Sequence, residues 1–257
     1  MVLKNNTSLG QHWLKNRFIL DEIADLAAYG DDGEDFSNET CLEIGPGLGF
    51  LTSSLLKRFS KVVAVEYDAE LARKLPGSFP GKNLEVVSGD ILKFDFAKMT
   101  APYVVAGNIP YYITSPIIEK VLTASVLPER VVLLMQKEVA ERIVSERETG
   151  LSLFVKNRAD VFVGPVVLAK EFTPPPKVDS EVLVLEPHAP KVPEKVFELI
   201  RRGFAMPRKK LIHNLAGLTS KEELLKILEN NGISLDARPG DLHLDDWAKL
   251  AIDLNLL

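Results

Sequence analysis

The stretch Cys41-Leu42-Glu43-Ile44-Gly45-Pro46-Gly47-Leu48-Gly49-Phe50 predicts a buried strand that ends in a glycine-rich turn and continues into a helix. Similar short β-branched runs recur along the chain, and segments with helical spacing lie between them. This alternation predicts an α/β domain with a parallel, doubly wound sheet. The expected strands are 41–44, 62–65, 84–87, 103–106 and 131–135, and the expected helices are 50–59, 69–75, 115–124 and 137–146.

The pattern changes twice in the second half of the chain. Two extended stretches, 161–168 and 181–185, have no helical pattern between them, which favours an antiparallel pair at the edge of the sheet. After 187–193, only helical patterns follow, near 194–204, 208–215, 221–230 and 245–254. The sequence therefore predicts an α/β domain over 1–187 and a small helical domain over 188–257.

The composition is that of an ordinary globular chain. Of 257 residues, 46% are hydrophobic and 26% are charged, and the apolar runs of about five residues are far too short to cross a membrane. The single cysteine, Cys41, cannot form an intrachain disulfide, and the four histidines lack metal-ligand spacing. We expect a cytoplasmic protein without a leader peptide or metal site, and a monomer because the core accounts for the apolar faces.

Charge is segregated along a chain whose net charge is −5. The segment from Asp21 to Glu43 has nine acidic residues and no lysine or arginine, whereas 201–210 has five basic residues and no acidic one. Such runs are usually solvated faces, but a basic run can also bind nucleic-acid phosphates.

The loops after the first three expected strands carry groups suited to an adenosine. The glycines at 45, 47 and 49 depart from the G-x-G-x-x-G dinucleotide fingerprint, which makes a nicotinamide cofactor less suitable. Glu66, 21 residues after Gly45, can accept hydrogen bonds from both ribose hydroxyls. Asp90 could accept one from an adenine amino group, or could simply cap a helix. The combination predicts S-adenosylmethionine, whose positive charge suits acidic loops.

The fourth expected strand leads into Asn108-Ile109-Pro110-Tyr111, which resembles the N-[LIP]-P-[YF] motif of amino-methyltransferases. An exocyclic adenine amine is a poor nucleophile because its lone pair is delocalised into the ring. The Asn108 side-chain oxygen and the Ile109 carbonyl would hold both amine hydrogens and aim the lone pair at the methyl group. Tyr111 would stack on the base, and Pro110 would fix its direction. The alternative is an ordinary turn with Tyr111 in the core.

Over essentially its whole length the chain resembles the ribosomal RNA adenine dimethyltransferases that modify small-subunit RNA. The resemblance implies a Rossmann-like class I S-adenosylmethionine methyltransferase fold and a role in ribosome biogenesis. It also implies two methyl transfers to each of two adjacent adenosines near the RNA 3′ end, after the base leaves its stack. Phe172 would then face the target base across from Tyr111. The matching segments are 10–14, 42–49, 89–90, 108–111, 135–140 and 172–180.

The expected functional residues fall into three groups. The catalytic group is Asn108, Ile109, Pro110, Tyr111 and Phe172. The cofactor-binding group is Gln11, His12, Leu14, Glu43, Gly45, Gly47, Glu66, Tyr67, Asp90, Ile91 and Asn108. The group expected to bind RNA phosphates in the helical domain is Arg201, Arg202, Arg208, Lys209 and Lys210.

The chain departs from the usual family pattern at two places. His12 and Trp13 stand where the N-terminal motif usually has Asn and Phe, so the contact assigned to that Asn is open. In the helical domain, Met206-Pro207-Arg208-Lys209-Lys210 replaces the usual Gln-Arg-Arg-Lys run, so the basic character persists while individual RNA contacts do not transfer.

Three other functions compete with this hypothesis. Large-subunit rRNA adenine methyltransferases that confer antibiotic resistance share the motif at 108–111 and the cofactor loops. The segment 172–180 favours the small-subunit branch instead. A ribosome-assembly or transcription factor without catalysis would not need Asn108, Tyr111, Glu66 and Asp90 intact. A small-molecule methyltransferase would not need a basic helical domain.

Overall fold

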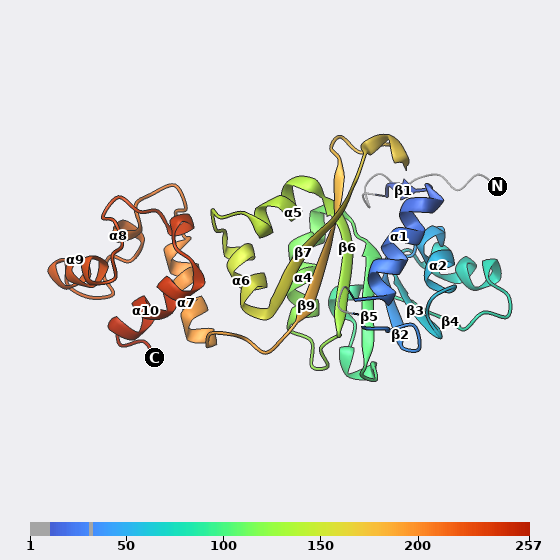
Figure 1. Ribbon diagram of the computed structural model, residues 1–257, viewed down its shortest axis with the longest axis horizontal. Coiled ribbons are helices and arrows are strands. Elements are labelled where there is room, and N and C mark those ends of the chain that lie inside the picture. The colour runs from blue at the N-terminus through green and yellow to red at the C-terminus, as the bar shows by residue number, and fades with distance from the viewer. Residues whose placement is uncertain (1–10, 31–32) are drawn as a thin grey trace. The chain divides into compact units, whose positions relative to one another are not determined.

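The computed structural model describes residues 11–30 and 33–257, and the chain divides into two compact units (Figure 1). The first unit comprises Met1–Ala140 and Asp160–Pro187, and the second comprises Glu141–Ala159 and His188–Leu257. The division after residue 187 coincides with the expected domain boundary. The second unit also includes 141–159, which we had expected in the α/β domain, because Leu153 of this segment packs in the core of the helical unit.

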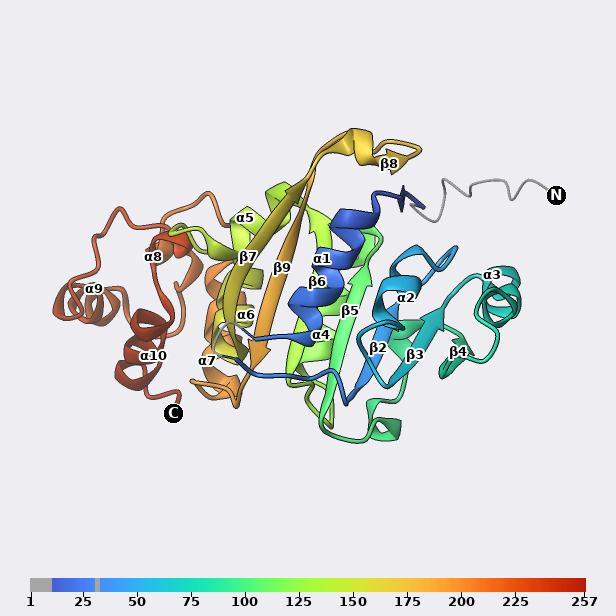
Figure 2. The same ribbon diagram turned by 45° about the vertical axis from the view of Figure 1, so that its right-hand side comes forward.

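The first unit is built on a seven-stranded mixed sheet with the order β4-β3-β2-β5-β6-β9-β7 (Figure 2). The five strands from β4 to β6 are parallel to their neighbours, as expected, and β9 runs antiparallel to β6. The strands are β2 (Thr40–Ile44), β3 (Lys61–Glu66), β4 (Leu84–Ser88), β5 (Tyr103–Asn108), β6 (Arg130–Gln136), β7 (Ala159–Val167) and β9 (Ser180–Pro187).

The register of the parallel strands brings four loops to one edge of the sheet. Ile44 at the end of β2 pairs with Val65 of β3 and with Gly107 of β5, and Glu66 pairs with Ser88 of β4. The loops that follow these strands therefore begin side by side. In open α/β sheets, this carboxyl edge is where ligands bind.

Helices of the first unit cover the sheet. They are α1 (Arg17–Ala28), α2 (Phe50–Leu55), α3 (Ala69–Lys74) and α4 (Thr114–Leu122). Helix α5 (Lys137–Val144) begins in the first unit and ends in the second, because the division falls after Ala140. The expected helix 50–59 ends earlier, because after Leu55 the backbone tightens into turns in which the Arg58 amide bonds the Leu55 carbonyl. Helix α1 was not anticipated; the Asn16 side chain caps it and its apolar face is buried.

A hydrophobic core fills the space between α1, α2 and the sheet. Gly49 precedes α2 with a φ of 82°, and a β-carbon there would lie 2.8 Å from both Leu75 and Phe79. Only glycine combines this left-handed backbone with such a close approach. The glycine-rich turn is therefore held tightly against the structure that follows β3.

A two-stranded ribbon joins segments far apart in the sequence. Strand β1 (Trp13–Leu14) pairs antiparallel with β8 (Phe172–Thr173), with Leu14 opposite Phe172. The sequence analysis had not predicted this pairing, because two-residue strands have no detectable periodicity. It brings the N-terminal motif and the 172–180 segment together.

The second unit is helical and packs around Trp247, which is fully buried. Its helices are α6 (Gly150–Arg158), α7 (Glu194–Gly203), α8 (Leu211–Asn214), α9 (Lys221–Asn230) and α10 (Leu244–Asp253). Helix α6 was not expected, and α8 covers only part of 208–215. A β-carbon at Gly203 would lie 2.2 Å from the Trp247 ring, so only glycine fits there. No helix in the described part of the chain is long and apolar enough to span a bilayer.

Candidate active site

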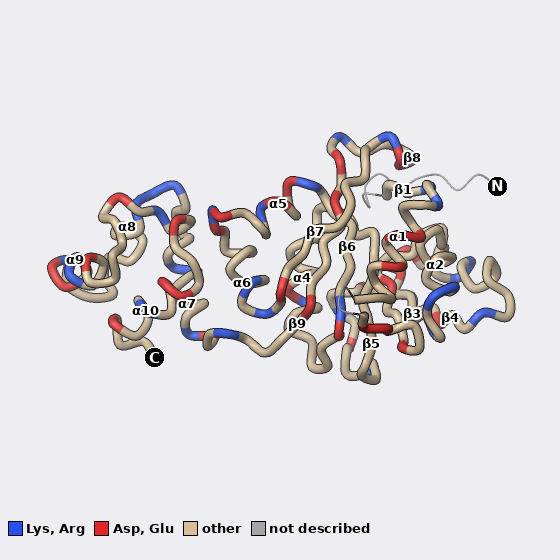
Figure 3. Tube along the Cα trace, viewed as in Figure 1, with Lys and Arg blue, Asp and Glu red and all other residues tan. Residues whose placement is uncertain are grey.

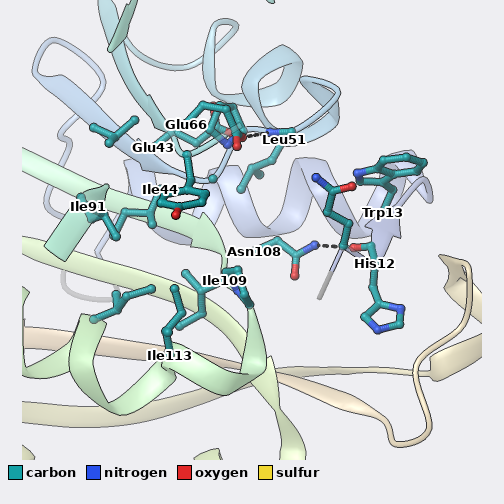
Figure 4. Close-up of a pocket in the computed structure, with 18 of the residues that line it drawn as sticks. His12, Trp13, Glu43, Ile44, Leu51, Glu66, Ile91, Asn108, Ile109 and Ile113 are labelled. Carbon is teal, nitrogen blue, oxygen red and sulfur yellow. Dashed lines mark hydrogen bonds between the residues drawn. The ribbon is translucent and has the colours of Figure 1, made fainter. Parts of the chain in front are cut away.

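A cavity of about 300 Å³ lies at the carboxyl edge of the sheet in the first unit. Figure 4 shows Glu43 and Glu66 on one side of it, His12 and Trp13 on another, and Asn108 between them. A volume of this size is within the range of small-ligand sites. All eleven residues expected to bind a cofactor line the cavity, as do Ile109, Pro110 and Tyr111, but Phe172 does not.

The glycine-rich turn forms one wall of the cavity. Gly45 and Gly47 have φ values of 67° and 57°, in the left-handed region that favours glycine. A β-carbon on Gly47 would lie 3.5 Å from the indole nitrogen of Trp13. The turn thus exposes bare backbone to the cavity, with the Trp13 ring against it.

Glu66 links this turn to the end of β3. One carboxylate oxygen accepts a hydrogen bond from the Gly47 amide at 2.9 Å, and the other accepts one from the Asp68 amide at 2.8 Å. Burial raises the pKa of Glu66, and these amides oppose that rise. Because each carboxylate oxygen has two lone pairs, Glu66 can still accept hydrogen bonds from two ligand hydroxyls.

Glu43 is a fully buried carboxyl group that lines the cavity. Neither of its oxygens has a hydrogen-bond partner among the residues the structure describes. The pKa of Glu43 is raised to about 8, mainly by burial; Thr52 opposes the rise and the charge of Glu66 adds to it. A buried carboxyl without a partner is costly, which makes Glu43 a candidate contact for a cationic ligand.

Asp90 caps a short helix and also lines the cavity. Its Oδ1 atom accepts a hydrogen bond from the Leu92 amide at 3.0 Å and caps a short 3-10 helix at Ile91–Lys93. The residue also lines the cavity, together with the buried Ile91. Its other oxygen has no hydrogen bond to a described residue and is available to a ligand amine.

The Asn108 amide has a defined orientation. Its nitrogen donates a hydrogen bond to the main-chain carbonyl of His12 at 3.1 Å, as the dashed line in Figure 4 shows. The side-chain oxygen consequently points away from His12 and can accept a hydrogen bond in the cavity. The neighbouring Ile109 is buried, and its amide donates to the Leu134 carbonyl in β6, which fixes the turn. This arrangement matches the acceptor role expected of Asn108.

Tyr111 lines the same cavity and is held at its hydroxyl. The hydroxyl lies 2.7 Å from the Ser180 hydroxyl, and burial raises the pKa of Tyr111 so that the phenol stays neutral. Its ring faces the His12 imidazole, with ring centres 5.9 Å apart and planes 16° from parallel. Tyr111 is thus a ring on the cavity wall, as the stacking hypothesis requires, rather than a core residue.

The structure places Phe172 in the core instead of on the cavity wall, where it was expected. Its side chain is only 2% exposed, packs in the hydrophobic core and does not line the cavity. The reason is the β1–β8 pairing: residue 172 lies opposite Leu14 and both side chains point inward. Phe172 anchors the segment that carries Ser180, and the ring beside Tyr111 is His12 instead.

Sequence reasoning missed Ser180 and Trp13 as parts of this site. Both lie in segments that the sequence analysis had matched to the family, but their contacts depend on the β1–β8 ribbon. Gly10, the first residue of the N-terminal motif, lies outside the described residues.

The five basic residues expected to bind RNA lie in the second unit and are exposed (Figure 3). Three are engaged within the unit: Arg201 pairs with Glu194, Lys210 pairs with Asp236, and Arg202 donates to the Asn214 and Ala216 carbonyls. Arg208 and Lys209 form no ion pair with a described residue. They are the cations freest to bind phosphate.

Comparison with known proteins decides the family. A model of the ribosomal RNA adenine dimethylase family matches residues 2–255. The chain belongs to this family. Within the described residues, no cluster of His, Cys, Asp or Glu could hold a metal ion.

Relatives with close similarity cover nearly the whole dimethylase chain. Ribosomal RNA small subunit methyltransferase A of Nostoc sp. strain PCC 7120 is 38% identical over 262 residues, which is 94% of each chain. The protein of that name from Thermosynechococcus vestitus is 36% identical over 97% of each chain.

Two solved structures share the fold. A dimethyladenosine transferase from Plasmodium falciparum has a TM-score of 0.78 and 30% identity, and covers 95% of this chain and 98% of its own. The 23S rRNA methyltransferase ErmE has a TM-score of 0.75 and 25% identity, and covers 95% of this chain and 99% of its own. The expected methyltransferase fold is confirmed.

Proposed function

We propose that this dimethylase transfers methyl groups from S-adenosylmethionine to the N6 amines of two adjacent adenosines near the 3′ end of small-subunit rRNA, and so acts in ribosome biogenesis. The observation that carries the proposal is the cavity in which Asn108, with its amide oxygen free, lies beside the acidic pair Glu43 and Glu66. The curated relatives that modify small-subunit rRNA match this chain end to end.

The residues of the cavity fit S-adenosylmethionine. Glu43 offers an unpartnered buried carboxyl to a positively charged group, and Glu66 offers acceptors to two ribose hydroxyls. Asp90 offers an oxygen to the adenine amine, beside the apolar Ile91 and the Tyr67 ring. When bound, this cofactor supplies an electrophilic methyl group on its sulfonium.

The chain's own residues prepare the attacking amine. The Asn108 oxygen and the Ile109 carbonyl accept its two hydrogens, which turns the nitrogen lone pair out of conjugation and toward the methyl group. Tyr111 holds the ring of the base by stacking. No strong general base is needed, because the nitrogen becomes acidic once alkylated and loses its proton to water.

Exposed Arg208 and Lys209 in the helical unit support contact with RNA phosphates. The acidic run from Asp21 to Glu43 supports the view that RNA is bound through the basic segment rather than through the whole surface.

The test is methyl transfer from radiolabelled S-adenosylmethionine to unmethylated small ribosomal subunits and, separately, to large-subunit RNA. Nucleoside digestion and mass analysis then identify the product. Dimethyladenosine in the small-subunit RNA is the expected result. Label only in large-subunit RNA would replace the proposal with the resistance activity, the second candidate that the likeness to ErmE favours. Cofactor binding without any transfer would indicate an assembly factor.

A further inference from the structure

His12 contacts Asn108 through its main chain and Tyr111 through its side chain. Its carbonyl accepts the hydrogen bond from Asn108, while its imidazole faces the Tyr111 ring. The ring nitrogen Nδ1 lies 2.8 Å from the Pro174 carbonyl. The imidazole is therefore positioned by the 172–180 segment, which the β1–β8 ribbon holds beside it.

The geometry of the two rings suits a site for a planar base. Their planes are only 16° from parallel and their centres are 5.9 Å apart. Stacked bases lie about 3.4 Å apart, so a base between two rings needs them about 6.8 Å apart. Because the distance between ring centres is an upper limit on the spacing of the ring planes, the two rings must separate by at least about 1 Å to admit a base, and both residues already line the cavity.

Among the described residues, no other ring stacks opposite Tyr111. Phe172, the expected candidate, is buried in the core, and Tyr112 lines the cavity without a ring contact to Tyr111.

We propose that the imidazole of His12 forms the second face of the target-base site, so that the adenine inserts between His12 and Tyr111 with its amine at Asn108. The inference rests on the proposed function, because it assumes that a nucleic-acid base is the methyl acceptor. In the alternative arrangement, His12 only covers Tyr111 and must move away before the base enters. Removing the His12 ring would then leave methylation unchanged or increase it, whereas our proposal predicts a decrease.

Three substitutions separate the ring face from the other contacts of His12. His12→Ala removes the face, His12→Phe keeps a planar face without a partner for Pro174, and His12→Asn keeps a polar group without the ring. All three retain the main-chain carbonyl that orients Asn108. Phe18→Ala is the control, because Phe18 is 89% exposed on α1 and lies outside the cavity.

The measurements are kcat and KM for the rRNA substrate and the cofactor affinity by calorimetry. Stacking on an aromatic face contributes enough to predict a roughly 5- to 100-fold fall in kcat/KM for His12→Ala and His12→Asn. His12→Phe should stay within about threefold of the wild type, by comparison with that range. Far-ultraviolet circular dichroism shows whether each variant is folded, and calorimetry separates a loss at the base site from a loss of cofactor affinity, for which His12 is also a candidate. A fall in kcat/KM that follows only the fall in cofactor affinity would overturn the proposal.

An unchanged or increased kcat/KM in His12→Ala would overturn the proposal and identify a cover. The proposal would also be overturned if His12→Asn kept the wild-type kcat/KM while His12→Phe lost it. The hydrogen bond to Pro174, and not the ring, would then be the contact that supports activity. The series is run on whichever rRNA the wild-type protein methylates. A failure of the small-subunit assignment therefore changes the substrate, while the order of the variants still decides the role of His12.

Discussion

The cavity has two ends that are assembled differently. The cofactor end, defined by Glu43, Gly47 and Glu66, comes from neighbouring strands in register, and both of its carboxyl groups are buried. The base end, defined by His12, Asn108 and Tyr111, combines β5 with the N-terminal segment and is partly exposed. One end is fixed by the sheet itself, and the other depends on contacts between segments about 100 residues apart or more.

The largest expected effect is that of Asn108→Ala, which should lower kcat strongly while leaving cofactor binding nearly unchanged. Loss of a preoriented hydrogen-bond group at the reacting atom typically costs about 100- to 1,000-fold in kcat. Because Asn108 belongs to the base end, the cofactor dissociation constant should change little. Single-turnover methylation and calorimetry on the same preparation check both values; near-normal turnover would remove Asn108 from the mechanism.

At the cofactor end, the buried Glu43 should make the free energy of unfolding depend on pH. The pKa of Glu43 is raised from 4.5 to about 8 in the folded protein, so the folded state holds a proton that the unfolded state loses. The contribution of the protonated Glu43 to the free energy of unfolding is fully present below pH 4.5 and is lost as the pH rises toward about 8. Glu43→Gln should therefore gain stability relative to the wild type across this window, on the order of a few kcal/mol.

Denaturant unfolding of the ligand-free protein at several pH values measures this difference. The control is Glu22→Gln, an exposed carboxyl on α1, which should show no such trend. A constant difference between Glu43→Gln and the wild type from pH 5 to 8 would show that Glu43 ionises normally.

Glu66→Ala should weaken the cofactor end without touching the base end. The substitution removes the acceptor for the Gly47 and Asp68 amides as well as for ligand hydroxyls. Hydrogen bonds to a charged group are each worth about 1.5–3 kcal/mol, so the cofactor affinity should fall about 10- to 100-fold. Calorimetry tests this, with Glu66→Gln as the milder variant. Unchanged affinity would reject the ribose role.

The smallest effect should come from outside the cavity. Replacing Arg208 and Lys209 by Gln should weaken RNA binding and flatten its salt dependence by about 0.7 log units per lost single-strand phosphate contact. Methylation of saturating RNA should be unaffected. Lys249→Gln, an exposed lysine of the same unit, is the matched control. An unaltered salt slope in the double variant would place the RNA surface elsewhere.

The same contrast explains what could be predicted from the sequence. Glu43, Glu66 and Asp90 follow strands whose β-branched runs are visible locally, and parallel pairing then dictates where they meet. The burial of Phe172 and the placement of the His12 ring beside Tyr111 could not be foreseen, because both depend on a two-residue ribbon with no periodic pattern. Helix α6 was missed for a related reason: its residues are buried on several sides in the second unit.

The hydrogen bond from Asn108 to residue 12 ends on a main-chain oxygen, and this has an evolutionary consequence. Every amino acid carries that oxygen, so the side chain at position 12 can be exchanged without disturbing the amide that directs methyl transfer. If the His12 ring forms part of the base site as proposed, substitutions at this one position could alter contact with the base while leaving the orientation of Asn108 intact.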